Sequence, residues 1–229
     1  MDEYKQELSS YEKGKKSEIR KSYWDSKGES IIDRILRAIC TDYDLGRMMY
    51  IRVLPHQPID NYVKMTNIKA VDNRNHWMRF DFIFEETSSH TILLVVELDG
   101  FYHEEKEQKE RDAYKDGVCA ALNIMPVRIK YREIKDINNE NDVRAQYEGE
   151  IVKNLLKSYF ASSYYFGFEK NWEQQKSMGE EKYKDLCNRY DEEIRNCEKK
   201  DKKRKYEKLR KYLEEAYYEY VPTTRMKKC

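Results

Sequence analysis

The sequence predicts an α/β domain with a mixed central sheet flanked by helices, followed by a charged helical extension. Three observations predict this architecture. Apolar residues recur at helical spacing after Gly28, apolar stretches typical of strands follow at 79–84 and 91–98, and a long polar stretch with helical stripes closes the chain. We therefore expect three parts: a polar arm at 1–27, an α/β domain at 28–165 and a helical extension at 166–229.

Composition narrows the class of protein. Of the 229 residues, 38% are charged, and the charges balance to a formal net charge of +1. Net charge therefore indicates no particular partner, and any basic surface must come from the distribution of the charges. No pair among the five cysteines has the C-x-x-C spacing of a zinc or redox site. Reduced thiols, no signal-peptide pattern and no apolar run of about 20 residues predict a cytoplasmic protein that does not associate with a membrane.

The first element of the α/β domain is an amphipathic helix. Its apolar side is formed by Ile31, Ile32, Ile35, Leu36 and Ile39, which recur at helical spacing. Glu29 lies near this apolar side, in the first turn of the helix. The short apolar stretch 47–54 comes next and could form a strand that Pro55 and Pro58 end.

Two clear strands follow. In 79–84, the side chains of Phe80, Phe82 and Phe84 are expected on one face, with Asp81 and Ile83 on the other. The stretch 91–98 is continuously apolar, which is typical of a strand in the middle of a sheet, covered on both faces. The polar residues between the two stretches predict a turn.

A crossover unit continues the sheet. The stretch 108–122 predicts a helix, and 126–129 predicts another buried strand. A helix between two neighbouring strands joins them in parallel, by a right-handed crossover. An amphipathic helix around 151–160 ends the domain. The extension carries two helical stripes, at 183–197 and 209–217, which predict two helices, one interrupted helix or a hairpin.

Acidic side chains gather where the central strand ends. Glu97 and Asp99 are two positions apart on a strand, so they point to one face of the sheet. If the strand that carries Asp81 pairs with this one, three carboxylates converge near one sheet edge. Two like charges about 4 Å apart repel by roughly 4 kcal/mol at an effective dielectric constant of 20, and burial adds several kcal/mol. Protons, basic side chains or a divalent cation could compensate this charge, and carboxylate oxygens suit Mg²⁺ or Mn²⁺.

Residues next to these acids suit phosphodiester chemistry. A divalent ion can activate a water and stabilise the charge that develops on a phosphate. His103, just past the strand, could move a proton. Arg111 and Lys115 lie one helical turn apart and could contact a phosphate, or they could belong to an exposed face held by salt bridges.

The order of these residues resembles a superfamily of nucleases. Glu29 on a first helix, Asp81 on a strand and the segment V-E-L-D-G-F-Y-H at 96–103 are similar to the restriction-endonuclease-like (PD-(D/E)XK) superfamily. The residues that follow resemble the branch that holds the very-short-patch repair endonuclease and related domains. These residues are Gln108, Arg111-Asp112, Lys115-Asp116 and Val127-Arg128-Ile129. The resemblance covers residues 28–132, a little under half of the chain.

The resemblance implies a restriction-endonuclease-like core and a metal-dependent endonuclease, with DNA favoured over RNA. It implies that Asp81, Glu97 and Asp99 hold Mg²⁺ or Mn²⁺, that His103 takes part in proton transfer, and that Glu29 supports the metal or its water. Gln108, Arg111 and Lys115 would then contact the phosphate.

Two positions depart from the pattern. Asp99 stands where the superfamily usually has a lysine, which leaves the general base open. Asn123 replaces the usual glycine before the last strand, but asparagine also adopts a left-handed turn.

Other interpretations remain open on the sequence alone. Each acid could be a solvated strand end or an acid at a helix terminus. The domain could bind nucleic acid without turnover, because the usual lysine is absent. The stretch 169–220 could form a homodimer, dock a partner protein or serve as a scaffold. Its nine basic residues at 198–211 could form a solvated helix face or follow a nucleic-acid backbone. We interpret His56, His76 and His90 as loop residues without ligand-like partners.

Overall fold

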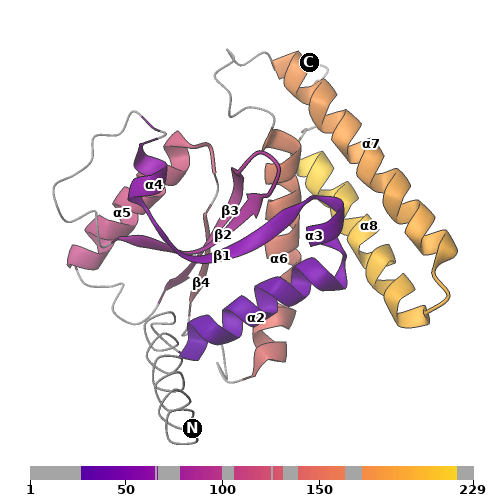
Figure 1. Ribbon diagram of the computed structural model, residues 1–229, viewed down its shortest axis with the longest axis horizontal. Helices are drawn as coiled ribbons and strands as arrows, with labels where there is room; N and C mark the ends of the chain where they lie inside the picture. The colour runs from indigo at the N-terminus through magenta and orange to yellow at the C-terminus, as the bar shows by residue number, and fades with distance from the viewer. Residues whose placement is uncertain are drawn as a thin grey trace, which may run out of the picture.

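The computed structural model describes residues 27–64, 66, 78–99, 106–124, 126–130, 139–162 and 172–220. Its sheet lies between helices on both faces (Figure 1). The elements are α2 (Lys27–Asp42), α3 (Leu45–Met48), β1 (Ile51–Pro58), α4 (Asp60–Val63), β2 (Arg79–Glu86), β3 (Thr91–Asp99), α5 (Lys106–Ala121), β4 (Pro126–Lys130), α6 (Glu140–Ala161), α7 (Trp172–Asn196) and α8 (Lys200–Tyr220). The expected polar arm, apart from Lys27, lies outside the described residues, as do His76 and His103.

Four strands form one mixed sheet in the order β1-β2-β3-β4. β1 pairs with β2 and β2 pairs with β3 in antiparallel fashion, whereas β3 and β4 are parallel and are joined by the crossover that contains α5. β3 has a strand on each side and is buried from Thr91 to Leu98, as its continuously apolar sequence predicts. The predicted α/β class with a mixed sheet is confirmed.

β1 differs from the strand predicted at 47–54. Leu45–Met48 forms the short helix α3, and the strand runs from Ile51 to Pro58. Pro58 is the last residue of the strand, as expected, whereas Pro55 lies inside it, so the expectation that Pro55 also ends the strand is wrong. Among the described strands β1 lies at the edge of the sheet, with only β2 beside it, so a residue without an N–H is tolerated there.

The three phenylalanines of β2 do not share one face, which corrects the simple alternation. Phe82 and Phe84 belong to the larger apolar core, whereas Phe80 packs with Ile83 in the smaller one. Tyr62 of α4 contacts Phe80, with the two ring centroids 5.8 Å apart. The segment that follows β1 thus covers the start of β2 and takes Phe80 into the smaller core.

Two apolar cores flank the sheet. The smaller core lies against α4 and α5, and the larger lies against α2, α6 and the C-terminal helices. α7 and α8 form a hairpin, one of the arrangements that the two stripes predict (Figure 1). Their apolar stripes face inward, since Leu186, Tyr190, Leu209 and Leu213 are buried in the larger core. The hairpin therefore completes the core on the α6 side.

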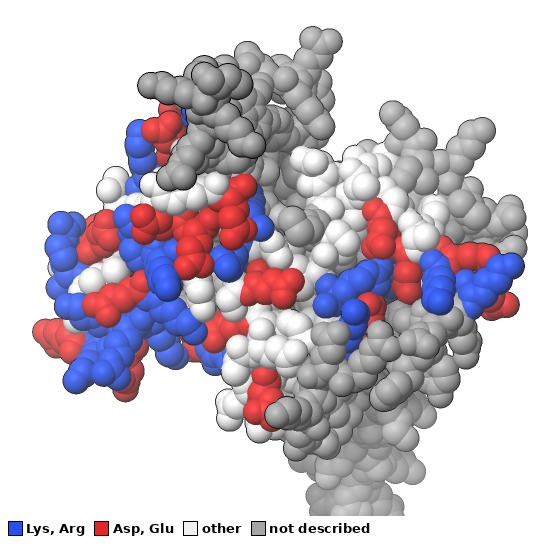
Figure 2. Space-filling view, turned by 180° about the vertical axis from the view of Figure 1, so that it is seen from behind, with Lys and Arg blue, Asp and Glu red and all other residues white. Residues whose placement is uncertain are grey.

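Ion pairs also join the hairpin to α2 and α6. Nζ of Lys205 lies 3.1 Å from Oδ1 of Asp42, and Nζ of Lys208 lies 3.4 Å from Oε2 of the buried Glu148 on α6. Several of the basic residues at 198–211 are thus paired within the chain. Figure 2 shows positive and negative side chains intermingled over this helical part of the molecule. In keeping with this charge, none of the described helices is both long and apolar enough to span a membrane.

Candidate active site

Two carboxylates lie side by side where β2 and β3 part. Phe82 pairs with Val96 in the antiparallel ladder, and the next register position puts Asp81 opposite Glu97. Oδ2 of Asp81 accepts a hydrogen bond of 2.7 Å from the backbone N–H of Leu98. The Asp81 side chain therefore reaches across to β3 just beyond the last backbone pair.

Glu97 is the most deeply buried acid of this group, with 1% of its surface exposed. Its Oε2 accepts a hydrogen bond of 2.6 Å from Nζ of Lys115, which reaches the sheet from α5. Its Oε1 is buried too and has no hydrogen-bond partner among the described residues. An unsatisfied carboxylate oxygen in such a place costs about 1–3 kcal/mol or more. Glu97 therefore has one partnered oxygen and one that is left for another group.

The pKa shifts of Glu97 and Lys115 indicate which sign of charge is in excess in the cluster. Burial, and after it the charge of Asp81, raise the pKa of Glu97, Lys115 opposes the shift, and the net result is a pKa of about 8. Burial lowers the pKa of Lys115, but Glu97 and Asp81 together raise it above its ordinary range. Both groups hold their protons more tightly than in water, Glu97 chiefly because it is buried and Lys115 because two carboxylates lie near its ammonium group. The cluster is therefore short of positive charge.

Asp99 is held on the β4 side of the cluster. Its Oδ1 accepts a hydrogen bond of 2.8 Å from Nη1 of Arg128, which pairs with Glu97 in the parallel ladder of β3 and β4. Nη2 of Arg128 donates a hydrogen bond of 2.7 Å to Asp116 on α5, and Asp112 lies 3.8 Å from Nη1. The guanidinium thus draws Asp99 toward the helix. In the sequence, Arg128 could be noticed as a charged residue between two apolar residues, Val127 and Ile129, of a predicted buried strand.

The structure separates the three side chains that were predicted to contact phosphate. Lys115 is buried against Glu97, as described above. Gln108 donates a hydrogen bond of 3.1 Å to Oδ1 of Asp112. Arg111 is exposed, and its Nε lies 3.4 Å from the backbone oxygen of Glu107. Only Lys115 therefore joins the described carboxylate cluster.

Asn123 adopts the left-handed conformation that the sequence led us to expect, with φ of 58°. It follows α5 and precedes β4. An asparagine therefore serves at this turn, where the resembling branch has glycine.

Glu29 and His56 form a contact that the sequence did not indicate. Nε2 of His56 lies 3.8 Å from Oε2 of Glu29, and both side chains are about nine-tenths buried (9% and 11% exposed). His56 lies on β1, and its φ of 49° is left-handed, which costs a residue other than glycine about 1–3 kcal/mol. The interpretation of His56 as a loop residue without a partner is therefore wrong. His90 lies in the turn between β2 and β3, as predicted, but it too has a partner, because its Nδ1 lies 2.5 Å from Oε1 of Glu85.

The oxygen atoms of this carboxylate cluster are of the kind that binds a hard divalent cation. Asp81 and Glu97 supply carboxylate oxygens from adjacent strands, and such oxygens are the ligands that Mg²⁺ and Mn²⁺ prefer. Within the part of the chain that the structure describes, no three His, Cys, Asp or Glu side chains form a group that could hold a metal ion. His103 lies outside that part. The described residues therefore supply a pair of oxygen ligands.

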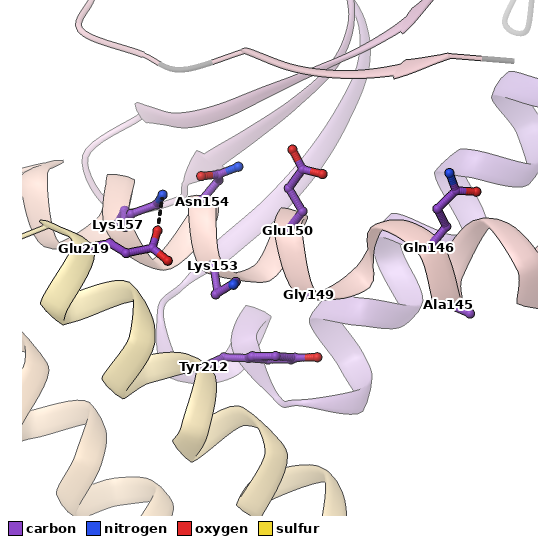
Figure 3. Close-up of a pocket in the computed structure, with 9 residues that line it drawn as sticks. All are labelled: Ala145, Gln146, Gly149, Glu150, Lys153, Asn154, Lys157, Tyr212 and Glu219. Atoms are coloured by element: carbon purple, nitrogen blue, oxygen red, sulfur yellow. Dashed lines mark hydrogen bonds and ion pairs between the residues drawn. The ribbon is translucent and has the colours of Figure 1, made fainter. Parts of the chain in front are cut away.

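Away from the carboxylate cluster, a hollow lies between α6 and α8 (Figure 3). It has a volume of about 520 Å³. Nζ of Lys157 lies 2.8 Å from Glu219, and Nζ of Lys153 lies 3.3 Å from Glu215. These lysines join the two helices, so the hollow is part of the seam that attaches the hairpin.

A comparison with protein families finds a match to the middle of the chain. Residues 46–148 match a family described as Protein of unknown function (DUF2726). The matched segment contains all four strands and α5, and it includes Asp81, Glu97 and Asp99 but not Glu29. It covers less than half of the chain. No curated protein and no solved structure matches. The chain is thus similar to that family over its sheet.

Proposed function

We propose that this protein is a metal-dependent nuclease that hydrolyses phosphodiester bonds, with DNA as the favoured substrate. The observation that carries the proposal is the buried Glu97 opposite Asp81, with a raised pKa and one oxygen without a described partner. Strongly perturbed carboxylates beside a charge partner are typical of functional sites. A divalent cation would supply the positive charge that this cluster lacks.

The order of residues along the chain also supports the proposal. Glu29, Asp81, Glu97 and Asp99 follow one another as in the PD-(D/E)XK superfamily. A mixed four-stranded sheet with helices on both faces is compatible with its core. The matched family has no known function, so this support comes from the residues themselves.

Asp81 and Glu97 would hold the ion, with Asp99 beside them. A bound Mg²⁺ or Mn²⁺ lowers the pKa of water and stabilises negative charge on a phosphate. Arg111, exposed on α5, would bind a phosphate of the substrate, with Gln108 nearby on the same helix. His103 would move a proton at the attacking water or the leaving oxygen.

Lys115 has a specific part in this proposal. The superfamily's usual lysine is absent from position 99, but the ammonium of Lys115 reaches Glu97 from α5. It would fix the Glu97 carboxylate and bring positive charge to the reacting phosphate. Part of the function of the absent lysine would thus be supplied by a residue from another element.

To test the proposal, the full-length protein is incubated with a supercoiled plasmid or with a short RNA, and cleavage is measured. Each substrate is tested with Mg²⁺, with Mn²⁺ and, separately, with a chelator. We expect nicking of the plasmid that requires the metal and is lost in Asp81→Ala and in Glu97→Gln. Glu180→Gln is the matched control, because Glu180 is a partly exposed acid on α7 that is paired only with Lys184 in the described contacts. Cleavage by both site variants at the rate of the unmodified protein would contradict the proposal.

A second function, nucleic-acid binding without turnover, is favoured by one observation. Lys115 and Arg128 already pair with Glu97 and Asp99, which offsets part of the acidic charge without any metal. In that case the protein would retain DNA in a filter-binding or anisotropy assay, and no cleavage would appear with either metal. The same variants would then leave binding unchanged.

A further inference from the structure

We propose that His56 belongs to the same site as a positioning residue that links Glu29 to Asp81; this inference rests on the proposed function. His56 comes from the edge strand β1, whereas the acids come from β2 and β3. The inference therefore extends the site by one strand and gives Glu29, at the start of α2, a physical connection to it.

The strand register puts His56 in line with the carboxylates. Pro55 pairs with Phe82 and Gln57 pairs with Phe80, so His56, between them, lies across from Asp81. Asp81 in turn lies across from Glu97. By register, a row of His56, Asp81 and Glu97 thus crosses three strands. His56 lies between two backbone pairs of β1 and β2, and Asp81 and Glu97 lie one position beyond the last pair of β2 and β3.

The same row continues into the last strand. Glu97 is in register with Arg128 on β4. The row therefore has acidic residues on the two middle strands and residues that can carry positive charge on the two edge strands. This order suits a site in which His56 and Arg128, on the edge strands, orient the acids on the two middle strands.

The backbone at His56 has an unusual conformation for a strand. Its φ of 49° is left-handed, and prolines stand at 55 and 58 on either side. A left-handed residue interrupts the alternation of the strand and redirects its side chain. Such conformations in residues other than glycine cluster at functional sites. Here the redirected imidazole lies against the carboxylate of Glu29.

Glu29 and His56 together form a buried polar pair in that place. Both side chains are about nine-tenths buried, and Oε2 of Glu29 lies 3.8 Å from Nε2 of His56. A glutamate that faces one side of an imidazole fixes the orientation of the ring, as carboxylates do for histidines in metal sites. We therefore assign His56 the task of holding Glu29 and Asp81 in a fixed relation.

The first measurement uses substitutions that the backbone tolerates. Asparagine accepts a left-handed conformation, so His56→Asn keeps the turn and removes the imidazole. We expect kcat for plasmid cleavage to fall by about 10–100-fold with KM unchanged, as for partners of metal ligands. His90→Asn is the matched control, because His90 is also left-handed (φ 56°) and contacts a glutamate, at the other end of β2.

A double-mutant cycle tests the link to Glu29. Because the two residues act as a unit, Glu29→Gln combined with His56→Asn is expected to lower kcat no further than the stronger single change. Independent effects that multiply would overturn the link. Thermal unfolding of each variant shows whether a lower kcat reflects lost function or a smaller fraction of folded protein.

The second measurement needs no substitution of His56 and no cleavage. Mn²⁺ is titrated into the full chain, its binding is followed by electron paramagnetic resonance, and the four histidine ring signals are followed by NMR. Signals are assigned by replacing the other histidines one at a time. Paramagnetic broadening falls steeply with distance, so the His56 signal is expected to broaden well before that of His90.

The outcomes separate the two proposals. If Mn²⁺ binds and DNA is cleaved, but His56 broadens no earlier than His90 or His56→Asn cleaves at the normal rate, the inference fails and the nuclease stands. If Asp81→Ala leaves Mn²⁺ affinity unchanged and no cleavage occurs, the proposed function fails and the inference fails with it.

Discussion

Lys115 of α5 and Glu97 of β3 form a buried ion pair, with Nζ of the lysine 2.6 Å from Oε2 of the glutamate. The two residues are 18 positions apart, and the crossover between β3 and β4 brings them together. Positive charge therefore reaches the acidic end of β3 from a helix, whereas the strand itself carries acidic Glu97 and Asp99 there. This pair leads to the first two predictions.

Removing the ammonium group should destabilise the fold. Lys115→Met leaves Glu97 buried beside Asp81 with no described basic partner on its Oε2. Above about pH 8, where Glu97 is ionised, breaking one side of such a buried pair costs about 3–5 kcal/mol. Urea denaturation measures the free energy of unfolding. Lys184→Met is the control, because its pair with Glu180 is exposed and contributes below about 1 kcal/mol. Equal small losses in both variants would show that the buried pair adds no stability.

The raised pKa of Glu97 should make stability depend on pH. The unfolded glutamate releases its proton near pH 4.5, whereas the folded one keeps it to about pH 8. Between these values the folded state binds more protons, so the free energy of unfolding should fall as pH rises from about 4.5 to 8 and level off above. The fall should be on the order of a few kcal/mol.

Glu97→Gln isolates this contribution. Glutamine does not titrate, so the difference between the unfolding curves of the two proteins at pH 5, 7 and 8.5 reports Glu97 and the groups coupled to it. We expect the unmodified protein to lose stability relative to the variant as pH rises. A difference that stays constant or grows in the other direction would mean that Glu97 is charged in the folded protein at neutral pH.

The hairpin of α7 and α8 should be required for folding, because its apolar stripes are part of the larger core. Leu213→Ala, at a fully buried position on α8, should lower the free energy of unfolding by about 2–5 kcal/mol. Tyr218→Ala on the same helix is the control, since Tyr218 is 55% exposed and its loss should cost far less. A chain that ends near residue 168 should lose its cooperative unfolding transition. Retention of that transition would show that the sheet and α6 fold without the hairpin.

The turn after α5 offers a test of backbone conformation. Asn123 has φ of 58°, so Asn123→Ala should cost about 1–2 kcal/mol, the penalty of a left-handed residue with a β-carbon. Asn123→Gly should be neutral or slightly stabilising, because glycine adopts this conformation without strain. Thermal unfolding of the two variants decides the order. Alanine as stable as glycine would contradict the left-handed turn.

Local patterns in the sequence determined the class and order of the elements. The period of apolar residues distinguishes helices from strands, and the unbroken apolar run at 91–98 indicated the buried middle strand. These signals depend on neighbouring residues alone. The acids Asp81, Glu97 and Asp99 could also be read from the sequence. Glu97 and Asp99 were assigned to one face because residues two apart on a strand share a face wherever that strand lies.

Only the tertiary structure decided which of these side chains meet. Strand register put Asp81 opposite Glu97, the crossover placed Lys115 on Glu97, and the left-handed turn of β1 brought His56 to Glu29. The inward packing of the α7–α8 stripes was likewise one of several possibilities. An apolar stripe shows that one face of a helix must be buried, but it does not show which element covers that face. Strand register and helix packing depend on contacts between residues that are far apart in the chain.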